Sequence, residues 1–164
     1  MRIGIISDTH NNLENLKRAL GVLFNEGIGM LVHCGDMTSP ETALLLVEYR
    51  LIYVYGNLDA ASGEIRKTLL SYDSNNFAGP FFSGTLEGAA LAVIHGDKPG
   101  SVEDLASSGK YRFVLHGHTH LHRHQQVGGT WVINPGALGG AHREPRSVCV
   151  LDLPTGETEF LKIT

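Results

Sequence analysis

RIGIISDTHNN, residues 2–12, joins a short apolar run directly to a cluster of polar residues. The β-branched residues over 2–7 predict a buried strand. Leucines at helical spacing follow over 13–24, and Asn11 or Asn12 can cap the start of the helix that they predict. The chain therefore opens with a strand, a polar loop and an amphipathic helix.

Apolar runs and helical patterns continue to alternate through the first two thirds of the chain. They predict strands over 30–35, 51–56 and 111–117, a hairpin over 80–96, and helices over 61–70, over 101–108 and from Ser39-Pro40 to about Tyr49. Four further runs, over 121–127, 130–134, 146–153 and 157–163, predict consecutive antiparallel strands. We expect an α+β fold of two mixed sheets packed face to face with helices outside, in a single domain over 1–164.

Composition and charge argue against several classes of function. The net charge is −4 at pH 7, without the clustered Lys and Arg residues that nucleic-acid binding requires. No apolar run approaches the roughly 20 residues of a membrane span, and the N-terminal run is too short for a signal peptide. We therefore expect a cytoplasmic protein that binds neither nucleic acid nor membrane.

Potential metal ligands follow one predicted strand after another. They are Asp8, His10, Asp36, Asn57, Asp59, His95, His118 and His120. Because the carboxyl ends of strands are where open α/β sheets place their sites, we expect these side chains to converge. A glycine precedes Asp36, Asn57 and His118, and we expect it to allow a sharp turn that brings the next side chain inward. Carboxylates, an amide and imidazoles without a thiolate suit two divalent ions such as Mn, Fe, Ni, Co or Zn.

The ordered motifs resemble the signature of the calcineurin-like metallophosphoesterases. They are Asp8-x-His10, Gly35-Asp36, Gly56-Asn57-x-Asp59, His95-Gly96 and Gly117-His118-x-His120. With INPGA at 133–137, the chain is most similar to the small YfcE-like phosphodiesterase branch. The resemblance implies the metallo-dependent phosphatase fold, a four-layer α/β/β/α sandwich, and hydrolysis of a small soluble phosphate diester.

The resemblance also implies roles for individual residues. Asp8, His10 and His120 would hold one divalent metal ion, and Asn57, His95 and His118 would hold a second, with Asp36 as the bridge. Manganese is the first choice, ahead of Ni, Fe, Co or Zn. A shared carboxylate would keep the ions about 3.5–4 Å apart, so that hydroxide activated by the pair attacks phosphorus. Asp36, Asn57 and His95 would thus be catalytic, and activity should fall at acid pH because the histidine ligands must be neutral.

Substrate contacts and the leaving group are less well defined by the motifs. Asn11, Asp59 and His116 are the candidate substrate contacts, although His116 can equally be a packed histidine at a strand end. Leu58 stands where many family members have a histidine near the leaving-group oxygen. Since leucine cannot donate a proton, a phosphodiesterase is favoured over a protein phosphatase. The role of Asp97, where relatives often have histidine, is open.

Two other functions remain as alternatives. The first is a non-catalytic or weakly catalytic metal-binding scaffold for protein interactions, as in the retromer subunit with this fold, but here every ligand position is filled. The second is a nuclease of the DNA-repair branch, which the length and the charge disfavour. His122 and His124 lie outside the signature and are expected on a solvated strand face. The sequence leaves the natural substrate, the metal, and the choice between monomer and homo-oligomer open.

Overall fold

The computed structural model describes residues 1–164 as four helices and eleven strands in two sheets. The six-stranded sheet has the order β11-β10-β1-β2-β3-β4, with β1 Arg2–Ile6, β2 Met30–His33, β3 Arg50–Val54, β4 Phe77–Gly79, β10 Ser147–Asp152 and β11 Thr158–Lys162. The five-stranded sheet has the order β5-β6-β7-β9-β8, with β5 Phe82–Leu86, β6 Ala89–Val93, β7 Phe113–Leu115, β8 His122–Val127 and β9 Thr130–Pro135. Both sheets mix parallel and antiparallel pairs.

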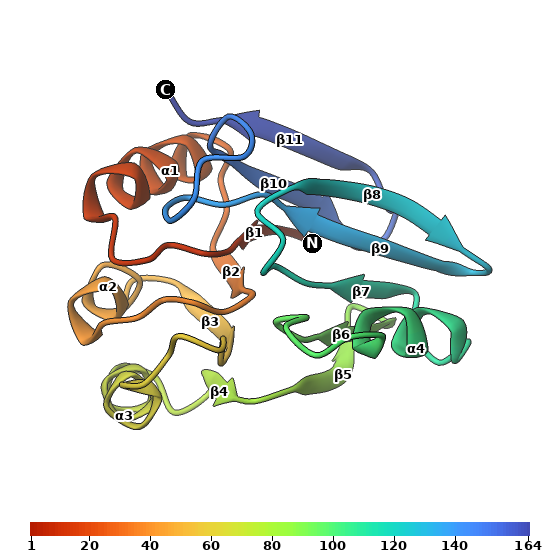
Figure 1. The fold of residues 1–164 in the computed structure, drawn as a ribbon, viewed down its shortest axis with the longest axis horizontal. Coiled ribbons are helices and arrows are strands. Elements are labelled where there is room, and N and C mark those ends of the chain that lie inside the picture. Colours follow the sequence, from red (N-terminus) through yellow and green to blue (C-terminus); the bar gives the residue numbers. More distant parts are fainter.

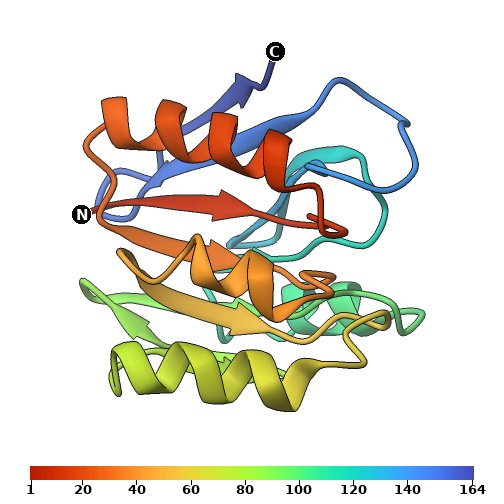
Figure 2. The ribbon, with the colours of Figure 1, turned by 90° about the vertical axis from the view of Figure 1, so that its left-hand side faces the viewer.

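The helices cover the outer faces of the two sheets. They are α1 Leu13–Asn25, α2 Pro40–Leu44, α3 Ser62–Tyr72 and α4 Ser101–Ser107. Helices α1, α2 and α3 lie side by side over the six-stranded sheet (Figure 2), and α4 lies against the other sheet on the far side (Figure 1). This arrangement confirms the α/β/β/α sandwich. No helix combines the length and the apolar character needed to cross a membrane.

Alternation along the strands explains the layers. In β1, Ile3 and Ile5 face the core between the sheets, whereas Ile6 faces the core under the helices. Both sets are fully buried, which is why β1 after Arg2 and β2 before His33 are apolar on both faces. A third, smaller cluster, which includes Val102 and Ala106, packs α4 onto its sheet.

Two sequence expectations are corrected by the structure. The last four strands are not consecutive neighbours, because β8 and β9 belong to one sheet while β10 crosses to pair with β1 in the other. The helix that starts at Pro40 ends at Leu44, well before Tyr49, and the chain continues in turns. Local sequence patterns carry no information on which distant strand provides the pairing partner.

Candidate metal centre

The predicted ligands meet where several strands end. Parallel pairing of β1, β2 and β3 in one sheet, and of β6 and β7 in the other, directs their carboxyl ends toward common loops. Asp8 and His10 follow β1, Asp36 follows β2 and Asn57 follows β3. His95 follows β6, and the loop after β7 carries His118 and His120.

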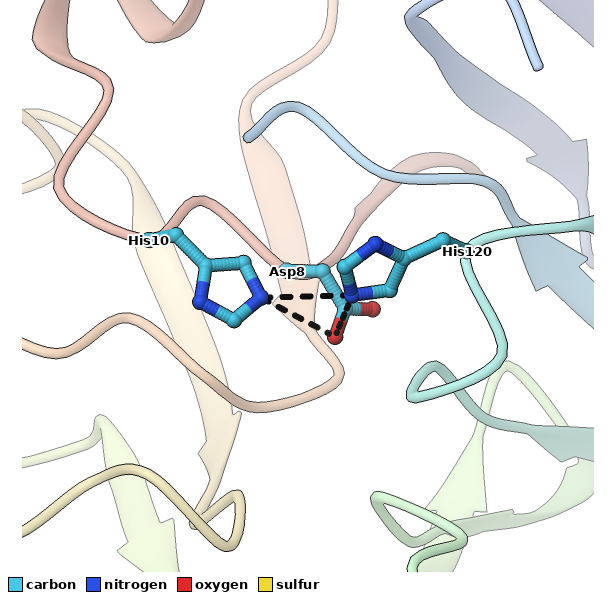
Figure 3. A group of neighbouring side chains, drawn as sticks. All are labelled: Asp8, His10 and His120. Atoms are coloured by element: carbon cyan, nitrogen blue, oxygen red, sulfur yellow. Dashed lines mark hydrogen bonds and ion pairs between the residues drawn. The ribbon is translucent and has the colours of Figure 1, made fainter. Parts of the chain in front are cut away.

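One group of donors consists of Asp8, His10 and His120 (Figure 3). The Nε2 atom of His120 lies 3.3 Å from Oδ1 of Asp8, and Nε2 of His10 lies 3.8 Å from the same oxygen. The two Nε2 atoms are 3.2 Å apart. Two ring nitrogens and one carboxylate oxygen therefore point at one small volume.

A second group shares Asp8 and adds Asp36 and His95. The Nε2 atom of His95 lies 3.5 Å from Oδ2 of Asp36 and 3.0 Å from Oδ1 of Asn57. Oδ2 of Asp36 is also 3.7 Å from Nε2 of His10, so this carboxylate lies between the two groups. The exposed His118 ring packs edge-on against His95, with ring centroids 5.1 Å apart.

Each buried carboxylate has one oxygen anchored and one directed toward the imidazoles. Oδ2 of Asp8 accepts hydrogen bonds from the Ser7 hydroxyl and the His118 amide, at 2.6 and 3.0 Å, while Oδ1 is buried without a hydrogen bond. Oδ1 of Asp36 accepts from the Leu58 amide at 2.9 Å. A buried anionic oxygen without a donor is costly, and a cation would satisfy it.

Backbone carbonyls orient two of the imidazoles. Nδ1 of His95 donates to the Cys34 carbonyl at 2.7 Å, and Nδ1 of His120 donates to the Ala141 carbonyl at 2.9 Å. These bonds direct each Nε2 toward the carboxylates, as is usual for metal-binding histidines. Together with the unpartnered oxygen of Asp8, they make the donor set a good fit for divalent cations.

The pKa values of these groups reflect their mutual interactions. Burial by itself disfavours the charged imidazole of His95, but Asp36 and the Cys34 carbonyl outweigh it and raise the pKa of His95 to about 9. Burial likewise raises the pKa of Asp8, yet the neighbouring His10 and His120 rings and the Ser7 hydroxyl overcome it and leave the pKa well below its ordinary value. The site therefore favours ionised carboxylates, which metal binding requires.

Backbone strain is concentrated in the loops of the centre. Eight residues other than glycine have positive φ, and all except Glu87 lie in these loops: Asp8, His10, Asn11, Asp36, Thr38, His118 and His120. Left-handed conformations at such residues are uncommon and persist where surrounding contacts enforce them. Six of the seven are Asp, Asn or His, the residue types other than glycine that adopt this conformation most often.

The glycines before the ligands serve a purpose that the sequence did not indicate. Gly35 has φ 102°, as a sharp turn requires, but Gly56 and Gly117 do not have positive φ. A Cβ atom on Gly56 would clash with Oδ1 and the amide of Asp36, and one on Gly117 would clash with the Ser7 hydroxyl. At these two positions the absence of a side chain provides space for the neighbouring loop.

The three expected substrate contacts lie outside the group of converging donors. Asp59 is buried, and its carboxylate accepts from the amides of Asp36, Thr38 and Gly56 at 2.7–2.9 Å. Both oxygens are thus used, which supports a structural role in place of substrate contact.

His116 and Asn11 have other surroundings. His116 is buried, and burial lowers its pKa to about 4. These surroundings are those expected of a histidine packed at the end of a strand. Asn11 is exposed beside His10, but its Oδ1 accepts hydrogen bonds from Ser39 and Thr42 at the start of α2. Asn12, whose Oδ1 accepts from the Asn15 amide, is the N-cap of α1.

A distant loop, residues 136–146, contributes contacts that sequence reasoning missed. A Cβ atom on Gly140 would lie 2.6 Å from His10 and 2.7 Å from His120, so the loop backbone packs directly on both rings. Arg146 donates to the carbonyls of Gly139 and Gly140 at 2.5 and 2.7 Å and so holds the loop in place. The glycines and alanines of the segment 136–141 are the sequence feature that could have suggested such a close approach.

His122 and His124 do not join the centre. His122 pairs with Glu144, with 3.2 Å between Nδ1 and Oε2, and contacts the Ser147 hydroxyl. His124 stacks on Trp131 with ring centroids 4.7 Å apart. Only two histidines of the run 116–124, His118 and His120, thus reach the centre.

Comparison with known proteins gives consistent matches over nearly the whole chain. A sequence model of the calcineurin-like phosphoesterase superfamily domain matches residues 1–156. The chain is 30% identical to "Phosphodiesterase MJ0936" of Methanocaldococcus jannaschii, over 99% of this chain and 98% of that protein. It is 28% identical to "Phosphodiesterase YfcE" of Escherichia coli K12, over 84% and 79% of the two chains.

Solved structures agree with these matches. The structure of an archaeal phosphodiesterase superposes with a TM-score of 0.93 at 29% identity, covering 99% of both chains. Vacuolar protein sorting 29 from Cryptosporidium parvum superposes with a TM-score of 0.67 at 21% identity, covering 98% of this chain and 95% of that one, and this similarity concerns the fold alone.

Proposed function

The chain belongs to the calcineurin-like phosphoesterase superfamily, and from this membership we propose that it is a metal-dependent phosphodiesterase. Its substrate would be a small phosphate diester, and its centre would hold two divalent ions, with manganese the first metal to test. We place the enzyme in the cytoplasm. Its net charge of −4 argues against a nucleic-acid partner.

The observation that carries the proposal is the position of the Asp36 carboxylate between two groups of donors. Asp8, His10 and His120 form the first group, and Asn57 extends the second, which contains His95. We assign His118 to the second group as well, because its ring packs on His95. The ions, when bound, would supply Lewis acidity toward the phosphoryl oxygens and lower the pKa of water.

The chain's own residues bind and orient the reacting groups. The Ser7 hydroxyl and the Leu58 amide donate hydrogen bonds to the carboxylates, and two backbone carbonyls accept hydrogen bonds from the imidazoles. These bonds fix the carboxylates and imidazoles before substrate arrives, which reduces the reorganisation required during reaction. The Leu58 side chain is 54% exposed and carries no acidic proton. Diesters whose leaving group departs without protonation should therefore be the better substrates.

Hydrolysis of bis(4-nitrophenyl) phosphate and of 4-nitrophenyl phosphate tests this proposal. Protein stripped of metal and reloaded with manganese should hydrolyse the diester faster than the monoester, whereas stripped protein should be inactive. Absence of turnover with manganese, nickel, cobalt, iron and zinc would favour the scaffold function.

The raised pKa of His95 predicts how metal affinity depends on pH. Below a pKa of about 9 the imidazole is protonated in the metal-free protein, and this proton must leave before Nε2 can bind a cation. The affinity of the protein for zinc should therefore rise by up to about tenfold per pH unit between about pH 6.5 and 8.5.

Competition with a chelating dye measures this affinity, and calorimetry in buffers of different ionisation enthalpy counts the released protons. In His95→Asn the zinc affinity should depend less on pH, because the side chain at position 95 then has no proton to release. An affinity independent of pH in the unmodified protein would contradict the assignment of His95 as a ligand.

A further inference from the structure

A cavity of about 280 Å³ adjoins the metal centre. It shares Asn57 and His95 with the centre, and Tyr55, Pro80, Phe81 and Ile94 line its other sides. We propose that this cavity binds a planar aromatic ring carried by one ester group of the substrate. The inference rests on the proposed phosphodiesterase function and adds the class of substrate.

The position of the cavity follows from the connection between the two sheets. Phe81 lies between β4, in the six-stranded sheet, and β5, in the other, and Figure 1 shows the chain crossing there. β4 runs parallel to β3, so the crossing starts at the sheet edge from which Asn57 projects. The first residue of β5 pairs with the last residue of β6, and His95 follows two residues after that end of β6. The crossing thus places the cavity beside both residues.

Proximity to the centre restricts what can enter the cavity. Oδ1 of Asn57 and Nε2 of His95 are 3.0 Å apart among the donors, and both residues also line the cavity. A phosphoryl group held by the donors would therefore direct one of its two ester substituents into this space. At about 280 Å³ the volume is at the lower end for ligand pockets, enough for one ring system but not for a polymer.

The walls favour an aromatic substituent over an alkyl one. Phe81 is 38% exposed and belongs to none of the three hydrophobic clusters, so its ring face is free to pack against a ligand. Tyr55 also lines the cavity, and its hydroxyl donates a hydrogen bond to the Ala78 carbonyl at 3.3 Å, which fixes the side chain. Aromatic side chains of this kind stack on the flat faces of rings and nucleobases.

Charged residues complete the cavity and give Asp97 a role. Asp97 and Lys98 line it, both are exposed, and neither forms an ion pair within the protein. They offer an acceptor and a donor to heteroatoms on the edge of a bound ring. A nucleobase would use both, whereas a plain aryl group would use neither.

Calorimetric titration of the manganese-loaded protein with three anionic ligands tests the inference. Methylphosphonate, phenylphosphonate and thymidine 5′-monophosphate carry the same kind of anionic head with no ring, a plain ring and a nucleobase. We expect the two ring ligands to bind at least about tenfold more tightly than methylphosphonate, consistent with the strength of aromatic stacking. If the nucleotide binds still more tightly than phenylphosphonate and loses this extra affinity in Asp97→Ala, the ring is a nucleobase. If both ring ligands gain the same affinity over methylphosphonate, the ring is a plain aryl group.

Substitutions separate the cavity from the metal centre. Phe81→Ala should remove the advantage of the ring ligands, and Phe81→Tyr should keep it. Phe24→Ala, a matched change of an aromatic residue that is 75% exposed on α1, should leave all three affinities unchanged. Because Phe81 is partly exposed and outside the core, its loss should not prevent folding, which thermal unfolding verifies.

The same preparations distinguish failure of this inference from failure of the proposed function. Equal affinities for ring and methyl ligands, in protein that still hydrolyses bis(4-nitrophenyl) phosphate, would overturn the aromatic site alone. Ring binding that depends on Phe81, in protein that hydrolyses no diester, would support the aromatic site and contradict the phosphodiesterase function.

Discussion

Asp36→Ala should reduce diester hydrolysis by about a thousandfold or more, since metal ions contribute several kcal/mol to stabilising the charge of such transition states. The carboxylate lies between the two groups of donors, 3.5 Å from Nε2 of His95 and 3.7 Å from Nε2 of His10. Its removal leaves these imidazoles without the anion that they share. The rate should be measured at saturating manganese, and metal content should be determined by mass spectrometry.

The control for this substitution removes a carboxylate elsewhere. Asp104→Ala, an exposed position in α4, should retain the activity of the unmodified protein. Asp36→Asn preserves the shape of the side chain and tests the charge itself, and we expect it to lose metal and activity nearly as fully. Full activity in either Asp36 variant would refute the bridging role.

Gly56→Ala should lower the free energy of unfolding by about 3 kcal/mol, near the upper end for overpacking a buried site. The new methyl group would meet both the carboxylate and the backbone amide of Asp36, and the amide cannot move away without displacing its loop. That amide also donates to Asp59, so the bond that fixes the loop would be lost or distorted. Chemical denaturation of the metal-free protein measures the effect.

Gly63→Ala is the matched control, because no atom lies within 4 Å of the position of its new Cβ. The residue lies in α3, where alanine should stabilise the protein by up to about 1 kcal/mol. Metal-free protein is the informative state, since it separates the packing effect from any loss of metal. Equal stability of Gly56→Ala and the unmodified protein would show that the loops tolerate the methyl group.

Much of the fold and of the candidate centre could be predicted from local patterns. Apolar runs identified strands such as β1 and β2, and helical spacing of leucines identified α1 with a cap at Asn11 or Asn12, of which the structure has Asn12. The two-sheet sandwich and the family resemblance were confirmed. The roles of the seven proposed metal ligands remain predictions, although the structure brings their loops together.

Other features could not be predicted, because they depend on contacts between distant segments. Asp59 has the sequence context of a site residue, yet its two oxygens are used by the amides of the loop after β2. The pairing of β10 with β1 brings the loop 136–146 onto the centre, where the Ala141 carbonyl orients His120. Neither contact leaves a periodic signal in the sequence.

The sequence by itself determined the kinds of donor, their order after successive strands and the superfamily. The tertiary structure alone decided which oxygen of each carboxylate is free, why Gly56 and Gly117 have no side chain, and where the cavity beside Phe81 lies. The physical reason is the range of the interactions involved. Strand and helix patterns arise from neighbouring residues, whereas hydrogen-bond partners, close backbone approach and cavities arise where segments far apart in the chain meet.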